Sequence, residues 1–424
     1  MFLSSSHILI PGIAAISILL MLLRPRGVTE VYWVGGGASL LVLLRLVSLH
    51  LAFKAVAEGT DVYLFLIGMM LLSELACEHG VFDWLSSMTI RSSRGSRVRL
   101  FTMVYAIGTA VTVFMSNDAT AIVLTPAILT AVRKAKVPPL PYLFACAMIA
   151  NAASFVLPIS NPANLVVFHK SMPPLGTWML SFGIPSLFSV VTTYLVLRWI
   201  FRGELTGHVN ADSATPLSDD GKIALAGLAL VTVVLLIASS LRMDLGLPTC
   251  LTALAVTLAV CIKTRHNPLE MAAEISWSTL ALVASLFILV DAMESVGALR
   301  FSSSALSYAA SLPMAAGALL TSFAVGMGNN LVNNLPMGLI AGSTLHASHL
   351  PVFITNAVLV GVDLGPNLSV TGSLATILWL IALRREHVDV SALDFLKVGA
   401  VVMPAALLTS TSGVILMQVI LKFR

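Results

Sequence analysis

The chain has 424 residues, of which 58% are hydrophobic and only 10% charged, and its mean hydropathy is +0.95. Soluble domains carry about 25% charged residues, so this composition excludes an ordinary soluble protein and predicts a polytopic integral membrane protein in a lipid bilayer. The net charge of +4 comes from short basic loops, and nothing in it indicates nucleic acid binding.

Apolar runs long enough to cross about 30 Å of hydrocarbon recur along the chain, and their non-alternating pattern favours helices over a barrel. The first run, Ile8 to Leu23, has neither a basic segment before it nor a small-residue cleavage site. We therefore expect a retained first helix rather than a signal peptide. The cysteines have no C-x-x-C spacing, which argues against a disulfide framework, a metal site or another cofactor site; they are Cys77, Cys146, Cys250 and Cys261.

An Asn-Asp pair, Asn117-Asp118, lies inside the apolar stretch from Met115 to Pro126. A carboxylate at mid-membrane depth is unfavourable by roughly 2.5 to 3.5 kcal/mol even on the lenient insertion scale, so it usually faces a cavity, a partner or a transport path. The plainer alternative is a neutral, hydrogen-bonded Asp that only braces a helix contact. We expect a re-entrant hairpin over about 100–132 that turns at Ser116-Asn117-Asp118.

The next helix is interrupted at Pro158-Ile159-Ser160-Asn161-Pro162-Ala163-Asn164, where two prolines remove helical hydrogen bonds and restrain the residues before them. Irregular backbone at membrane depth is tolerated only where it lines a cavity or is buried in protein. This segment therefore predicts a broken helix. A purely structural kink explains Gly35-Gly36-Gly37 well but not a break that carries asparagines.

A polar, helix-breaking stretch over 203–221 divides the chain into a first membrane repeat, 1–202, and a second, 222–424. A shift of 216 residues places Asn117-Asp118 onto Asn333-Asn334, and a shift of 212 places the first break onto Gly372 to Thr376. Weak internal repeats of this kind are typical of transporters.

The second half carries the same two interruptions. A hairpin is expected over about 313–345, turning between Asn329 and Pro336, and a broken helix follows with Gly361 to Asn367 and Thr371-Gly372-Ser373. Four breaks that meet near the midplane would present half-helix N-termini, free carbonyl groups and polar side chains to a polar solute.

The basic residues predict the orientation. With three helices, a hairpin, a broken helix and a fifth helix in each half, most of the 24 Lys and Arg residues fall on one side. The positive-inside rule makes that side cytoplasmic. The result is about ten spanning helices and two hairpins, with an external N-terminus and an inverted second repeat. The other side keeps Lys54, Lys170, Arg242, Arg300, Lys422 and Arg424. An alternative with twelve helices, in which each hairpin makes two full crossings, gives the same sidedness for the other loops, so the charges do not separate the two arrangements.

The segments Phe114 to Pro126, Asn333 to Pro336 and Gly361 to Leu380 resemble the ArsB-type arsenite/antimonite permeases of the ion-transporter superfamily. The resemblance covers essentially the whole chain. It implies efflux of trivalent arsenite or antimonite from the cytoplasm across the inner (plasma) membrane of a prokaryote, driven by protons or, in some members, by a partner ATPase. The chain has no Walker-type motif, so any ATPase would be a separate subunit.

Arsenous acid is a small neutral trihydroxide, so its site needs hydrogen-bond donors and acceptors more than fixed charge. Exchange for protons also needs a group that takes up and releases a proton, and intramembrane carboxyl groups serve this purpose in transporters. We predict Asp118 and Asp363 as proton-coupling residues, with Asp363 equally suited to clamp its own broken helix. The predicted substrate-binding residues are Ser116, Asn117, Ser160, Asn161, Asn164, Asn333, Asn334, Thr371, Ser373 and Thr376.

Other functions remain as alternatives. A sodium-coupled carboxylate carrier or a sodium/proton antiporter could use the same scaffold, but no Lys or Arg lies in any of the four breaks to meet an anion. An intramembrane aspartyl protease would need Asp118 and Asp363 to share a proton at close range, and the sequence around Asp363 lacks a Gly-x-Gly-Asp pattern. We therefore expect a transporter and not an enzyme.

Overall fold

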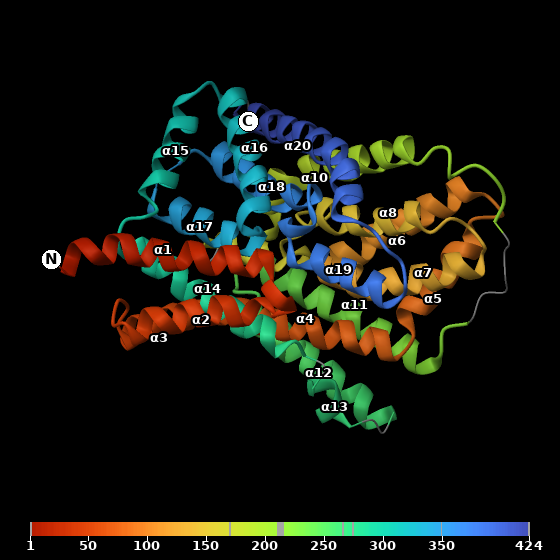
Figure 1. Ribbon diagram of the computed structural model, residues 1–424. Helices are drawn as coiled ribbons and strands as arrows, with labels where there is room; N and C mark the ends of the chain where they lie inside the picture. The colour runs from red at the N-terminus through yellow and green to blue at the C-terminus, as the bar shows by residue number, and fades with distance from the viewer. Residues whose placement is uncertain are drawn as a thin grey trace.

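The computed structural model describes residues 2–168, 171–209, 216–264, 267–273, 275–348 and 350–422. The regular elements of these residues are helices (Figure 1). Eight of the described helices are long and apolar enough to cross a membrane, which confirms the predicted all-α polytopic class.

The first half contains helices of two kinds, membrane-length helices and shorter pieces that belong to hairpins, breaks or surface segments. In chain order its helices are α1 (Phe2–Leu23), α2 (Glu30–Leu43), α3 (Leu49–Glu58), α4 (Thr60–Glu78), α5 (Val81–Ser92), α6 (Arg97–Phe114), the π-helical turn η2 (Ala119–Leu124), α7 (Thr125–Lys134), α8 (Leu140–Ala152), η3 (Pro158–Ser160), α9 (Pro162–Phe168) and α10 (Leu175–Ile200).

The second half follows the same order of long helices, hairpin and broken helix. Its elements are α11 (Asp219–Ser240), α12 (Gly246–Thr264), α13 (Pro268–Ala273), α14 (Trp277–Ser295), α15 (Arg300–Ser311), α16 (Met314–Val332), α17 (Asn334–Ala347), α18 (Val352–Leu364), η5 (Gly365–Asn367), η6 (Val370–Gly372), α19 (Leu374–Arg385) and α20 (Ala392–Lys422).

Each half thus holds a hairpin, α6 with η2 and α7 in the first and α16 with α17 in the second, followed by a broken helix, α8 with α9 and α18 with α19. The predicted linker is shorter in the structure, because its last residues, from Asp219, already form the first turn of α11 with Ser218 as the N-cap. Part of that linker, 210–215, lies outside the described residues.

The short helices α3, α5 and α15 have no counterpart among the predicted elements. Each has 10 to 12 residues with polar side chains along one face. All three are therefore too short and too polar to span a membrane. They connect the third long helix of a half to its neighbours at the ends of the molecule. Their apolar residues form no membrane-length run, so the apolar pattern of the sequence does not predict them.

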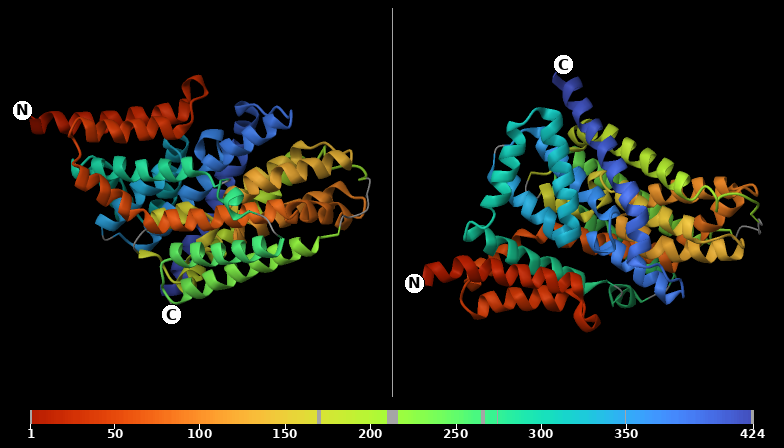
Figure 2. Two further views of the ribbon diagram at one scale, coloured as in Figure 1. Left: turned by 90° about the horizontal axis from the view of Figure 1, so that it is seen from below. Right: turned by 45° about the horizontal axis from the view of Figure 1, so that its top comes forward.

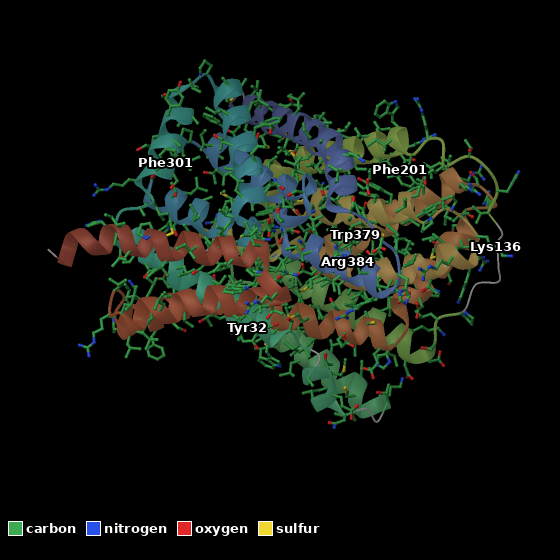
Figure 3. The ribbon with its side chains drawn as sticks, viewed as in Figure 1. Tyr32, Lys136, Phe201, Phe301, Trp379 and Arg384 are labelled. Carbon is green, nitrogen blue, oxygen red and sulfur yellow. The ribbon has the colours of Figure 1, made fainter. Side chains whose placement is uncertain are left out.

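Basic side chains mark one end of the molecule. Arg97 begins α6, whereas Arg133 and Lys134 end α7, and Arg133 bonds to Glu386 just after α19 at 3.2 Å. Figure 3 shows Lys136 at this end, which we name the basic end, and Phe301 on α15 at the opposite end. The predicted basic positions Lys170, Arg265 and Arg424 lie outside the described residues.

Packing places the hairpins against the broken helices of the other half. Helix α17 packs on α9, and η2 and α7 pack on α19. At the first contact Gly342 leaves room for the backbone, because a Cβ atom there would lie 2.8 Å from the carbonyl oxygen of Val167. Helices α10 and α20 pack against each other, whereas α1 lies at the edge of the molecule (Figure 2).

Candidate functional site

The first broken helix stops at Ala152 because the residues that follow cannot continue its hydrogen bonds. The orphaned carbonyl groups find other partners: Ser189 donates to Ala152 O at 2.8 Å, and the Trp178 indole donates to Phe155 O at 3.1 Å. The chain restarts at Asn161, whose backbone is extended and whose Oδ1 accepts from the amide of Ala163 at 3.0 Å. Asn161 therefore caps α9.

The second broken helix repeats this design. After α18 the chain makes two short 3₁₀ turns, η5 and η6, and becomes extended at Ser373. Ser373 Oγ accepts a hydrogen bond from the amide of Thr376 at 3.1 Å. It also shares a hydrogen bond of 3.0 Å with the Thr376 hydroxyl, in which either oxygen can donate. Ser373 therefore caps α19. Asn161 and Ser373 thus hold matching positions, each at the N-terminus of a second half-helix.

Three hydrogen bonds cross between the broken helices. Asn161 Nδ2 donates to Asp363 Oδ1 at 2.7 Å, and Asn151 Nδ2 donates to Asn367 Oδ1 at 3.0 Å. Asn367 in turn donates to Met148 O at 3.1 Å. These contacts fasten the end of each first half-helix to the break of the opposite half.

Asp363 is the most deeply placed carboxyl group of this centre. Its side chain is 1% exposed, yet among the described residues its second oxygen, Oδ2, has no hydrogen-bond partner. Buried polar atoms are normally paired, so an open acceptor of this kind marks a place for a proton, a water molecule or a solute.

The tip of the first hairpin lies at Met115 and Ser116, slightly earlier than predicted, since Asn117 and Asp118 already begin the returning leg. Ser116 Oγ accepts from the amide of Ala119 at 3.1 Å. Asn117 is buried and its Oδ1 is unpaired within the described chain, whereas Asp118 is half-buried. The leg continues as η2, a π-helical turn, and such turns often occur at functional sites.

The tip of the second hairpin is a single residue, Asn333, with φ 76° and ψ 157°. This conformation is strained for any residue except glycine. The side chain accepts from the amide of Leu335 at 3.4 Å and donates to Thr371 O at 3.1 Å, which ties the tip to the second break. Asn334 is also buried and, in the described part of the chain, its Oδ1 has no partner.

Several of the predicted substrate ligands make hydrogen bonds that hold the breaks together. Ser160 donates to Val113 O at 3.0 Å and so ties the first break to the first hairpin. Asn164 Nδ2 lies within 2.9–3.4 Å of the carbonyl oxygens of Ser154, Leu157 and Pro158. Thr371 donates to Asn330 O at 3.1 Å. Within the described residues, the buried amide and carboxyl oxygen atoms of the hairpins and broken helices that have no partner are the Oδ1 atoms of Asn117, Asn151, Asn164, Asn329 and Asn334 and Oδ2 of Asp363.

The sequence reasoning missed four asparagines that organise the centre. Asn329 donates to Gly361 O at 2.9 Å and Val362 O at 2.7 Å, and Asn330 donates to Gly365 O at 3.1 Å. Asn151 and Asn367 form the crossing contact described above. Two signals were present: Asn329-Asn330 precede Asn333-Asn334 by one helical turn, and Asn151 lies at the 212-residue repeat offset from Asp363.

Two cavities lie on either side of this centre. One, of about 490 Å³, lies at the basic end and is lined by α5, α7 and 216–218. The other, of about 760 Å³, lies at the opposite end and is lined by the ends of α3, α9, α14, α17 and α18. The described part of the molecule is therefore hollowed at both ends.

The charges of the centre limit what it can bind. No lysine or arginine is buried among the described residues, and no group of His, Cys, Asp and Glu in that part of the chain has the arrangement of a metal site. The described contacts join Asp363 to Asn161 and not to Asp118, so no carboxyl dyad is formed. The arrangement suits a small, uncharged or cationic polar solute rather than an anion.

Comparison with known proteins agrees with the predicted resemblance to arsenite permeases. The chain is 25% identical over 415 residues to an arsenical pump membrane protein of Yersinia enterocolitica and to one of Escherichia coli strain K12, covering 92% of this chain and 94% of each relative. It is 24% identical over 410 residues to an uncharacterised transporter of Synechocystis, with 88% and 90% coverage.

A solved structure shares the fold. The YdaH transporter of Alcanivorax borkumensis superposes with a TM-score of 0.56 at 14% identity, covering 88% of this chain and 87% of the other. A family model described as "Citrate transporter" (CitMHS) matches residues 12–360. The chain is therefore a multi-pass membrane transporter that belongs to the CitMHS citrate-transporter family.

Proposed function

We propose that this protein exports arsenite or antimonite from the cytoplasm in exchange for protons, across the inner membrane of a prokaryote. The basic end faces the cytoplasm on this proposal, as the positive-inside rule requires. The two halves act as inverted repeats, residues 1–202 and 222–424, that alternate access to the site between them.

The observation that carries the proposal is the buried centre, where side-chain oxygen atoms lack hydrogen-bond partners and no buried lysine or arginine lies among the described residues. Asp363 Oδ2, Asn117 Oδ1 and Asn334 Oδ1 are buried and unpaired within the described residues. A neutral trihydroxide offers three O–H donors, which match such acceptors and leave no charge to be neutralised. The arsenical pump relatives in Yersinia and Escherichia coli support this choice of substrate.

Asp363 and Asp118 have different roles in proton transfer in this proposal. Asp363 binds the transported proton, because it is the carboxyl group that lies between the two halves and is held by Asn161. Asp118 lies just after the tip of the first hairpin, beside Asn117, and takes part in passing the proton. A separate ATPase subunit is not needed for this exchange, although one could attach to the cytoplasmic face.

Uptake of arsenite into everted membrane vesicles tests the proposal. The lumen is made acidic, and uptake is measured with and without sodium and with a protonophore. We expect arsenite to accumulate only when the lumen is acidic and to be released when the protonophore is added. The rate of uptake should be the same with and without sodium. Uptake that requires sodium, or no uptake above that of vesicles lacking the protein, would contradict the proposal.

A carboxylate substrate is the second candidate, because the family model is described as a citrate transporter. Citrate carries several negative charges, and the centre has no buried Lys or Arg among its described residues to meet them. Citrate uptake measured in the same vesicles separates the two candidates. We expect none, and no competition of citrate with arsenite.

A further inference from the structure

The cavity of about 760 Å³ at the end opposite the basic end has a charged wall. Three carboxylic acids face it, Glu58 at the end of α3 and Asp291 and Glu294 at the end of α14. Lys54 and His346 line the same wall. We name this hollow the outer cavity.

The charged groups of the outer cavity lie close enough to influence one another. Glu294 interacts electrostatically with Asp291, Glu58 and His346, and Asp291 interacts with Glu58 and Lys54. Three acids against one lysine leave the cavity with a net negative potential, and a concave, poorly hydrated wall strengthens it. Such a potential concentrates protons and other small cations.

The other ionisable groups on the described helices that pack against α14 do not line the outer cavity. His50 on α3 is exposed, and Glu74 and Glu78 lie toward the basic end of α4. Asp61 on α4 accepts from the amide of Gly246 at 2.6 Å, and His7 on α1 donates to Val296 O at 3.0 Å. Glu30 on α2 pairs with Arg24. Glu294 and His346 therefore face a field set mainly by the outer cavity itself.

An unpaired amide lies at the floor of the outer cavity. Asn356 on α18 is 3% exposed and lines the cavity, and its side chain makes no hydrogen bond within the described chain. A buried amide without a protein partner is a place for an ordered water molecule or a polar solute. This observation does not depend on the acidic wall.

The floor amide lies on the same face of α18 as Asp363. Seven residues separate them, which is two helical turns, or about 10.5 Å along the axis. The valines Val166 and Val167 of α9 also line the cavity, and Gly342 of α17 lets the two helices approach closely there. Asn356 and Asp363 thus place a polar group at two levels of α18, beside this apolar contact.

We propose that external protons enter through the outer cavity, where Glu294 binds them beside His346 and Asn356 holds the water that leads to Asp363. This inference rests on the proposed arsenite/proton exchange and assigns its external proton uptake. Glu294 and His346 act on the proton supply and not on the arsenite site.

The test is the dependence of transport on external pH, which in everted vesicles is the lumen pH. Arsenite uptake is measured over a series of clamped lumen pH values for the wild type, Glu294→Gln, His346→Gln and Asn356→Leu. We expect Glu294→Gln to shift the half-maximal lumen pH to more acidic values, and His346→Gln to shift it in the opposite direction, because the electrostatic interaction with His346 opposes proton binding by Glu294. Asn356→Leu should lose proton-driven uptake at every pH.

Arsenite counterflow at equal pH on both sides, which needs no net proton movement, should remain near the wild-type rate for Glu294→Gln and His346→Gln. Glu78→Gln is the matched control, since Glu78 lies at the repeat offset of 216 on α4 at the basic end. It should keep the wild-type pH profile. The yield of each variant in the membrane verifies its folding. If Glu294→Gln does not fold, the pH profile of His346→Gln tests the inference in its place.

Wild-type pH profiles for both Glu294→Gln and His346→Gln, in a protein whose arsenite uptake is proton-driven, would overturn the inference while leaving the proposed function intact. A change in sodium dependence in place of the pH shift would also overturn it, because the cavity would then take a metal cation. If the wild type shows no proton-driven uptake, the proposed function itself fails.

Discussion

Asn151 and Asp363 occupy matching positions in the two halves, each as the next-to-last residue of the first half-helix. Each bonds across to the break of the opposite half, Asn151 to Asn367 and Asp363 to Asn161. The two positions differ in one respect: an amide stands in the first half where a carboxylic acid stands in the second. The symmetric scaffold therefore carries an asymmetric group that can release a proton.

Replacement of the central acid should separate binding from coupling. In Asp363→Asn the amide keeps the shape and the contact with Asn161 but cannot release a proton, so we expect normal membrane yield, arsenite counterflow and loss of uphill uptake. The measurement is uptake with and without a pH gradient.

The double variant Asn151→Asp with Asp363→Asn moves the acid to its matching position. We expect it to recover part of the uphill uptake that Asp363→Asn loses. Full uphill transport by Asp363→Asn alone would show that this acid has only a structural role.

Asp118 is tested in the same way at the hairpin tip. Asp118→Asn should fold and bind arsenite, because the residue is only half-buried and makes no described hydrogen bond that the amide would lose. Gradient-driven uptake should fall by tenfold or more if Asp118 passes protons, about 1.4 kcal/mol or more on the transport barrier. Uptake at the wild-type rate in this variant would remove Asp118 from the proton path.

The fold could be predicted largely from the sequence, because membrane-length apolar runs and polar breaks within them have few physical solutions. The hairpin around Asn333 and the break around Asn161 were located from Asn, Gly and Pro residues alone. The surface helices α3, α5 and α15 could not be found by a search for apolar spans.

The site could be predicted only in part, because sequence shows which polar groups are buried but not which of them bond to one another. Ser160 and Asn164 were predicted as substrate ligands, and the structure adds that both donate to backbone carbonyl oxygens while Ser160 also accepts from the amide of Leu157. The crossing contacts of Asn151 and Asn161 depend on long-range packing of the two halves, which no local pattern specifies.

Substitutions at Asn333 should separate backbone strain from side-chain contacts. Asn333→Gly relieves a conformation that costs about 1–3 kcal/mol but loses the bond to Thr371 O, whereas Asn333→Ala keeps the strain and loses the bond. We expect thermal unfolding in detergent to rank glycine above alanine, and arsenite binding to weaken in both. Equal binding by both variants and the wild type would exclude this amide from the substrate site.

A variant without cysteines tests whether thiols take part. Cys146 and Cys261 are buried on different helices, Cys77 is exposed, and Cys250 is half-buried. Tight arsenic(III) capture needs two or three converging thiolates, and such capture would also hinder release. We expect the variant with all four cysteines replaced by Ala or Ser to retain proton-driven efflux and arsenite resistance. Loss of transport at normal membrane yield, restored by Cys146 alone, would show that a thiol is required.

The most direct test of the account is proton movement caused by arsenite itself. Purified protein is reconstituted into proteoliposomes that contain a pH-sensitive dye, at equal pH on both sides and without sodium, and arsenite is added outside. The account predicts that the lumen becomes alkaline as arsenite enters, and that Asp363→Asn abolishes this change. Arsenite accumulation without any change of lumen pH, or a change that is the same in Asp363→Asn, would contradict it.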